Sequence, residues 1–192
     1  MSSLPSPSIL LEARALGFSR QDERVFGPVD FDLRAGDIAL VEGDNGSGKT
    51  TLMRVLTGML RAGEGDVLFA GQPFSLTTMG GAIVFLGHHL GLKSDLTARE
   101  NLDVSAGLYG VRDGTRPMEA LRVVGLGGFE DEPVRRLSAG QKKRAALARL
   151  LLLPARVWLL DEPYANLDRE GIALVNQLLD GHAARGGAAL VT

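Results

Sequence analysis

A glycine-rich run in the first third of the chain has the residue types that bind phosphate. Residues 43–50 read Gly-Asp-Asn-Gly-Ser-Gly-Lys-Thr and match the pattern G-x-x-x-x-G-K-[ST] at every fixed position. The glycines let backbone N–H groups face phosphate oxygens, Lys49 adds a charge for the β- and γ-phosphates, and the Thr50 hydroxyl is suited to ligate Mg²⁺. The sequence therefore predicts a nucleoside triphosphate site, whose expected contacts are Gly43, Asp44, Asn45, Gly46, Ser47, Gly48, Lys49, Thr50 and Thr51.

Two adjacent carboxylates form a second group of candidate site residues. Asp161 and Glu162 follow four apolar residues that predict a buried strand. Ligands gather at the carboxyl ends of strands in open α/β sheets, so we expect Asp161 to hold Mg²⁺ together with Thr50. Glu162 is expected to orient or deprotonate the attacking water, which makes Glu162 and Lys49 the predicted catalytic residues. The alternative is a solvated strand end.

The residues around the glycine-rich run predict the elements that position it. A short buried strand is expected over residues 37–42, and an amphipathic helix directly after the run, with Gly58 at its end. The helix prediction rests on apolar side chains at the spacing of one helix face: Leu52, Val55, Leu56, Met59 and Leu60. Such a helix directs its positive end at a bound phosphate.

The rest of the pattern indicates an α/β protein. Strands are expected over 9–15 and 25–33 as an antiparallel start, then over 67–70, 82–86 (a buried central strand), 157–161 and 188–191. Capping boxes at Thr97 and Ser138 predict two helices, Pro117 and Gly125 bound another, and a fourth is expected over 169–184. We expect one domain over 1–192, with an α/β core (1–88 and 153–192) and a helical subdomain over about 89–152.

Composition narrows the class of protein. The 192 residues carry a net charge of −2 and a pI near 5.9, which gives no support to a nucleic-acid partner, and there is no cysteine to form a disulfide or a thiolate site. The longest apolar region, 145–160, is interrupted by Arg149, Pro154 and Arg156, so we expect no direct membrane span. The amino-terminal residues lack the pattern of a signal peptide, which favours a cytoplasmic location.

Residues 137–141, Leu-Ser-Ala-Gly-Gln, resemble the signature motif Leu-Ser-Gly-Gly-Gln of ATP-binding-cassette (ABC) ATPases, and residues 165–168 are similar to the D-loop of that family. The resemblance covers nearly the whole chain. It implies a P-loop NTPase (RecA-like) core with an antiparallel β subdomain and an inserted helical subdomain, and it implies ATP and Mg²⁺ as ligands. It also implies a head-to-tail homodimer in which Ser138, Gly140 and Gln141 contact the ATP of the second ATP-binding subunit. From the residues alone, a capped core helix is the other interpretation.

One branch of the family is more similar than the rest. The segments that look like the haem-exporter ATP-binding subunits of bacterial cytochrome c maturation are residues 87–93, 95–97, 100–102, 22–26 and 42–46. His88 stands where most relatives carry a glutamine that couples the nucleotide to the membrane partner. The resemblance implies an ATPase that drives transmembrane permease subunits in c-type cytochrome biogenesis, peripheral to the cytoplasmic face of the bacterial inner membrane, with haem as presumed cargo. The alternatives are an exporter subunit for another cargo, a soluble ABC ATPase without transport, or a nucleotide-gated dimerisation module.

Two positions depart from the family pattern. Arg20 stands where relatives stack an aromatic side chain on adenine, and the guanidinium plane of Arg20, or the nearby Phe18, is expected to take that place. The family carries a γ-phosphate-contacting histidine just after the last core strand, and the sequence stops at Thr192 before such a residue. We therefore expect ATP and Mg²⁺ binding with turnover lowered on the order of a hundredfold. Turnover equal to that of a version extended through the histidine would refute this expectation.

Overall fold

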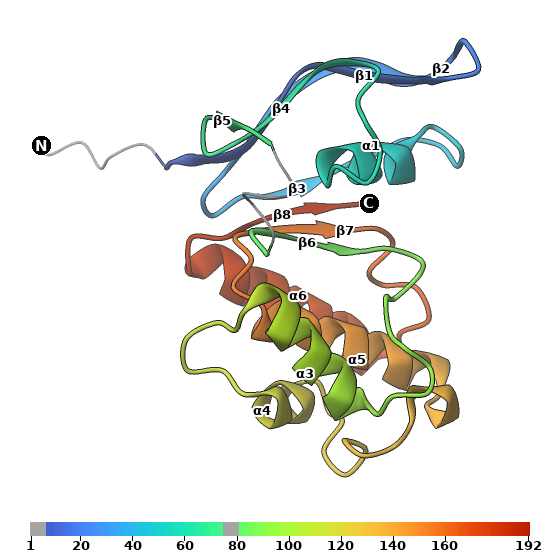
Figure 1. Ribbon diagram of the computed structural model, residues 1–192, viewed down its shortest axis with the longest axis vertical. Coiled ribbons are helices and arrows are strands. Elements are labelled where there is room, and N and C mark those ends of the chain that lie inside the picture. The colour runs from blue at the N-terminus through green and yellow to red at the C-terminus, as the bar shows by residue number, and fades with distance from the viewer. Residues whose placement is uncertain (1–6, 75–80) are drawn as a thin grey trace, which may run out of the picture.

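The first sheet is antiparallel and covers the phosphate-loop helix. In the computed structural model, which describes residues 7–74 and 81–192, this sheet has the strand order β2-β1-β4-β5. Its strands are β1 (Ile9–Arg20), β2 (Glu23–Arg34), β4 (Glu64–Phe69) and β5 (Gln72–Pro73). The β1 strand is longer than predicted because it continues past Ala15, whose φ of 44° marks an irregularity in the pairing with β2. Helix α1 (Lys49–Leu56) lies between this sheet and the next one (Figure 1).

The second sheet is parallel, and the candidate site lies at the carboxyl-terminal end of its strands. Its order is β3-β8-β7-β6, formed by β3 (Ile38–Leu40), β8 (Ala188–Val191), β7 (Val157–Leu160) and β6 (Ile83–Leu86). All residues of β7 and β8 are buried, as expected for inner strands covered on both faces. Because the strands are parallel, their carboxyl ends lie at the same end of the sheet. The segment 41–48 follows the carboxyl end of β3, and Asp161 follows that of β7.

Helices cover the other face of the parallel sheet (Figure 1). They are α3 (Ala98–Tyr109), α4 (Pro117–Val123), α5 (Ala139–Leu152) and α6 (Arg169–Ala184), with a 3₁₀ turn, η1, over Val134–Arg136. The capping boxes predicted at Thr97 and Ser138 are present, and Gly125 follows the end of α4 with a φ of 76°. One buried cluster joins side chains of α3, α4, α5 and α6 to β6 and β7. The division into a core and a helical subdomain stays a prediction.

Three expectations about the strands and α1 were wrong. The strand before the glycines is short and not buried: Ile38 is 44% and Leu40 62% exposed, because β3 pairs with β8 alone among the described residues. The strand at 83–86 is likewise at a sheet edge and pairs with β7, so it is not central. Helix α1 ends at Leu56, with Gly58 (φ 71°) just after its cap as predicted, so Met59 lies beyond the helix and is 62% exposed.

Candidate functional site

The glycine-rich loop between β3 and α1 has a conformation that only glycine adopts readily at three of its positions. Gly43, Gly46 and Gly48 have φ of 153°, 88° and 93°. A Cβ on Gly48 would lie 2.9 Å from the carbonyl oxygen of Val25 on β2, so the antiparallel sheet closes tightly over the start of α1. At Gly46 a Cβ would meet nothing within 4 Å, so this part of the loop faces open space. The loop therefore leaves room beside the amino end of α1.

Lys49 folds back over this loop. Its Nζ donates to the carbonyl oxygens of Gly43 at 2.6 Å and of Asp44 at 2.9 Å. The N–H of Ser47 also donates to the Asp44 carbonyl oxygen, at 3.1 Å, which closes the turn. These bonds hold the ammonium group across the loop opening, where an anion would meet it together with the first N–H groups of α1. Asn45 and Thr51 belong to the same segment, the former exposed and the latter half-buried in α1.

The loop is joined to the acidic strand end by one direct bond. The Thr50 hydroxyl donates to Oδ2 of Asp161 at 2.8 Å, and the Thr192 hydroxyl, at the end of β8, donates to Oδ1 of the same carboxylate at 3.1 Å. Asp161 is only 5% exposed. Two hydroxyl groups thus satisfy a buried carboxylate that has no cationic side chain within bonding distance among the described residues.

Glu162 is held in an unusual backbone conformation directly beside Asp161. Its φ is 50°, which is uncommon for a residue other than glycine. Its N–H donates to the Thr192 hydroxyl at 3.0 Å, and its carbonyl oxygen accepts from Nζ of Lys143, on α5, at 3.0 Å. Burial lowers the pKa of Lys143, and the negative charges of Glu162 and Asp161 oppose that shift. The exposed Glu162 carboxylate is thus carried on a backbone fixed from both sides.

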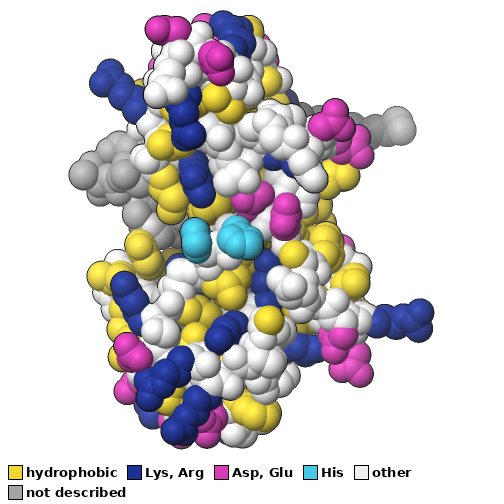
Figure 2. Space-filling view, turned by 90° about the vertical axis from the view of Figure 1, so that its right-hand side faces the viewer, with side chains coloured by type: hydrophobic (Ala, Val, Ile, Leu, Met, Phe, Trp, Pro, Cys, Tyr) yellow, Lys and Arg dark blue, Asp and Glu magenta, His cyan; other side chains and the backbone are white. Residues whose placement is uncertain are grey.

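A small hollow of about 160 Å³ lies over this carboxylate pair. His88 and Lys142 are part of its wall, together with Leu90, Ala139, Lys143, Asp161, Glu162, Ala165 and Asn166. Figure 2 shows histidine side chains lying side by side on one face of the molecule, near acidic side chains. The rings of the two exposed histidines, His88 and His89, are 5.6 Å apart. The structure therefore brings His88 to the same hollow as the predicted catalytic acid.

The signature residues lie at the start of α5. Oγ of Ser138 accepts from the N–H of Gln141 at 3.2 Å, and Oε1 of Gln141 accepts from the N–H of Ser138 at 2.9 Å. Gly140 lies close to the D-loop, since a Cβ there would be 3.6 Å from the Asn166 carbonyl oxygen. Within residues 7–74 and 81–192, no hydrogen bond joins these residues to the loop at 43–51.

The residues predicted to contact adenine, Arg20 and Phe18, lie on β1 of the antiparallel sheet. Arg20 ends β1 and faces Glu23 across the hairpin, exposed to solvent. The hairpin residues that reach the phosphate loop are Val25 and Phe26, and Phe26 pairs with Phe18 on β1. Phe26 therefore lies next to Gly48, and Phe18 is its partner on the neighbouring strand. The adenine contact of Arg20 or Phe18 stays a prediction.

Two residues of the site were not found from the sequence. Lys143 shares a helix face with the buried residues Leu147 and Leu150. A lysine on an otherwise apolar helix face indicates a buried polar contact, and this pattern could have identified it from the sequence. Thr192 carried no signal, because its role depends on β8 lying next to β7.

Two further observations concern the described residues as a group. They contain no cluster of three or more His, Asp or Glu side chains that could bind a metal by themselves. An Mg²⁺ ion at Thr50 and Asp161 would therefore take its other ligands from water or phosphate. None of the described helices is long and apolar enough to cross a bilayer.

Known proteins resemble this chain over most of its length. Residues 26–165 match the family model described as ABC transporter. The cytochrome c biogenesis ATP-binding export protein CcmA of Xanthomonas campestris pv. campestris (strain 8004) is 56% identical over 95% of this chain and 86% of its own length. The protein of the same name from Methylococcus capsulatus is 48% identical over 94% of this chain and 88% of its own length.

A solved ATP-binding subunit of an ABC transporter has the same fold, with a TM-score of 0.86 over 95% of this chain and 78% of that one, at 24% identity. The ABC ATPase fold expected from the motifs is thus confirmed. Since the family model covers most of the chain and relatives with one shared name match nearly all of it, the chain belongs to the ABC transporter family of nucleotide-binding proteins, among the CcmA ATP-binding export proteins.

Proposed function

We propose that this chain is the ATP-hydrolysing subunit of an ABC transporter complex that serves c-type cytochrome biogenesis. The observation that carries the catalytic part is the 2.8 Å bond between Thr50 and Asp161, because it joins the phosphate loop to the acidic strand end and sets Glu162 beside both. The transport part is supported by the relatives, whose names describe them as ATP-binding export proteins of cytochrome c biogenesis.

The residues present fit a magnesium nucleotide. The Thr50 hydroxyl and the Asp161 carboxylate are neighbouring oxygen ligands, and Mg²⁺ prefers one or two protein oxygens completed by phosphate and water. We assign Mg²⁺ to this pair and the ATP phosphates to the loop at 43–51. Mg²⁺, when bound, would neutralise negative charge that develops on the phosphates.

The other steps of ATP binding and hydrolysis would be carried out by side chains of the site. Lys49 can exchange its two carbonyl acceptors for phosphate oxygens, because both lie on the loop that surrounds the phosphates. Glu162 is the group that would orient or deprotonate the attacking water. Lys143 and Thr192 fix the backbone of Glu162 through its carbonyl oxygen and its N–H, so they are positioning residues. His88 lines the same hollow and would contact the attacking water or the phosphate.

We assign Ser138, Gly140 and Gln141 to the ATP of a second copy of the chain. This assignment is supported by the exposed position of Ser138 at the start of α5 and by the absence, in the described part of the chain, of a bond to its own phosphate loop. A helix amino end is favourable for an anion. A homodimer would therefore bury two nucleotides between the loop of one copy and the signature of the other.

The membrane partner would dock on the helical side of the molecule. Exposed apolar side chains gather on α3 and beside it, with Val104 49%, Leu108 70% and Tyr109 44% exposed. Such a patch suits an apolar partner surface. We place the subunit at the cytoplasmic face of the bacterial inner membrane, peripherally bound to transmembrane permease subunits, with haem as the presumed cargo.

The catalytic assignment is tested with Glu162→Gln. This substitution should abolish turnover and leave ATP-Mg²⁺ binding in place, so that a stable dimer accumulates with ATP and is seen by size-exclusion chromatography with light scattering. The matched control is Glu170→Gln, at an exposed position on α6, which should behave as wild type. A Glu162→Gln protein that stays monomeric at saturating ATP would contradict the dimer mechanism.

The transporter assignment is tested separately. We would isolate the tagged protein from gently solubilised membranes and identify the proteins that accompany it by mass spectrometry. Multi-span subunits of cytochrome c maturation are expected. A different permease would retain the ATPase and remove the haem assignment, and recovery without any membrane protein would favour a soluble ABC ATPase.

A further inference from the structure

A basic pocket of about 390 Å³ lies at the end of the parallel sheet opposite the phosphate loop. It is formed where β7 and β8 begin, by the segments that precede these strands, the end of α6 and the loop after α3. Asp161 and the loop at 43–48 follow the other ends of the parallel strands. The pocket is therefore separate from the nucleotide site.

The charged side chains of this pocket are mostly positive. Arg112, Arg156 and Arg185 line it, against the single carboxylate of Asp113. None of these four side chains forms an ion pair within residues 7–74 and 81–192. Burial lowers the pKa of Arg112, and the positive charge of Arg185 adds to that shift, which places two guanidinium groups within electrostatic reach of each other. The pocket thus concentrates positive charge, because three guanidinium groups face one carboxylate and none of them is ion-paired within the described residues.

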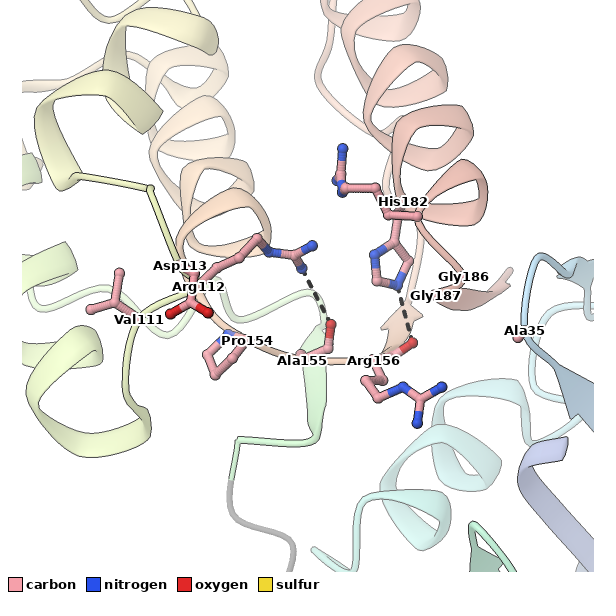
Figure 3. A pocket seen from close by; sticks show the side chains of 11 residues that line it. Ala35, Val111, Arg112, Asp113, Pro154, Ala155, Arg156, His182, Gly186 and Gly187 are labelled. Carbon is pink, nitrogen blue, oxygen red and sulfur yellow. Dashed lines mark hydrogen bonds between the residues drawn. The ribbon is translucent and has the colours of Figure 1, made fainter. Parts of the chain in front are cut away.

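The polar atoms in the wall are also incompletely satisfied. Nη2 of Arg112 donates to the carbonyl oxygens of Leu153 at 3.2 Å and Ala155 at 3.3 Å, whereas its buried Nε has no partner. His182 is 1% exposed, and its Nε2 lies 3.2 Å from the Arg156 carbonyl oxygen, while Nδ1 has no partner. Figure 3 shows the His182 ring and the Arg112 guanidinium on two sides of the pocket, turned toward one another.

We propose that this pocket binds an oxyanion of the phosphate class, held by the guanidinium groups of Arg112, Arg156 and Arg185. Guanidinium groups match phosphate oxygens in charge and in planar hydrogen-bond geometry. Arg112 is already oriented by two backbone carbonyl oxygens, so little of its side-chain freedom remains to be lost on binding. Free phosphate and the phosphate group of a monoester share this chemistry. The site does not depend on the ATPase assignment.

The sequence provides an internal reporter for this pocket. Trp158 is the only tryptophan of the chain, and its ring stacks on His182 with centroids 3.8 Å apart and planes at 7°. A charge that enters beside His182 changes the field at the indole and hence its emission. We would titrate the nucleotide-free protein with inorganic phosphate and with glycerol 3-phosphate while recording tryptophan fluorescence, and measure binding heat by calorimetry in parallel.

Three variants make the test specific. Arg156→Gln combined with Arg185→Gln, both at exposed positions, should weaken binding at least tenfold. Arg61→Gln combined with Arg116→Gln removes the same charge elsewhere and should change it less than twofold. Lys49→Ala, which disables the phosphate loop, should leave pocket binding in place. Tighter binding of one probe identifies free phosphate or a monoester as the ligand. No saturable heat or signal, equal binding by both double variants, or loss with Lys49→Ala would overturn the proposal.

Discussion

Replacing Lys143 by methionine removes the donor that fixes the Glu162 carbonyl oxygen and leaves the volume of the side chain nearly unchanged. Glu162 has a φ of 50°, a conformation that costs about 1–3 kcal/mol and persists only where neighbours enforce it. The two enforcing bonds come from Lys143 and Thr192, each at 3.0 Å. Without the bond from Lys143, the Glu162 backbone can relax and move its carboxylate away from the place where it would contact the attacking water.

The expected size of this effect follows from the type of bond. A hydrogen bond from a charged group contributes about 1.5–3 kcal/mol, and about 1.36 kcal/mol corresponds to a factor of ten in rate. If that contribution is felt in the transition state, kcat falls about 10- to 100-fold. The KM for ATP should hold within about twofold, because Lys49 and Thr50 are untouched. Thermal stability should change little, because the loss of this bond is offset by removal of the free-energy cost of burying an ammonium group.

The assay is steady-state ATP hydrolysis, with ATP binding and thermal unfolding measured on the same preparations. Lys143→Gln, which keeps an N–H donor, should retain more activity than Lys143→Met, and Lys93→Met serves as the exposed control. A kcat of Lys143→Met within twofold of wild type would refute the positioning role. A large loss of thermal stability together with a raised KM would instead identify Lys143 as a purely structural residue.

Three other perturbations test separate parts of the molecule. Gly48→Ala should weaken binding of a fluorescent ATP analogue on the order of tenfold or more, through a positive φ and a Cβ 2.9 Å from a carbonyl oxygen, whereas Gly128→Ala, with a φ of 89° and open space, should not. Burial lowers the pKa of His182 from 6.5 to about 4, so the neutral ring favours the folded state above pH 6.5 and this advantage is lost as pH falls toward 4. His182→Phe should therefore remove roughly 3 kcal/mol of the acid-induced loss in unfolding free energy, measured by denaturant titration across that range; an unchanged pH dependence would contradict this. Leu108→Ser, at a position 70% exposed, should reduce co-purification of the permease subunits without changing the ATPase rate of the isolated chain; unaltered recovery would exclude this patch as the docking surface.

Locally encoded features were predicted well. The capping boxes at Thr97 and Ser138 define helix starts through contacts between residues three apart, and both starts are where the sequence placed them. Helix α6 and strand β8 also have their predicted bounds, because Asp168 caps the former and Gly186 and Gly187 separate the two. The glycine-rich loop and the acid pair were recognisable for the same reason, since each is a contiguous motif.

Features that depend on neighbours distant in the chain were not predictable in this way. The apolar residues of β3 and β6 look the same whether a strand is central or at an edge, and only the sheet order reveals the 62% exposure of Leu40. Thr192 gains its role from the register of β8 with β7. Arg112 and Arg156 of the basic pocket are 44 residues apart, and Arg156 and Arg185 are 29 residues apart, so no local pattern unites them.

The bond between Thr50 and Asp161 also has a consequence for how the chain matures. It closes a separation of 111 residues, so it can form only after β3, β7 and the strand between them have been brought into one sheet. During synthesis the phosphate loop leaves the ribosome long before Asp161 exists. The proposed binding of a magnesium nucleotide at this pair would therefore follow assembly of the sheet, and a ligand that binds only the completed sheet raises the stability of the whole domain by mass action. Cellular ATP would thus act as a late folding partner that selects chains whose parallel sheet is correctly assembled.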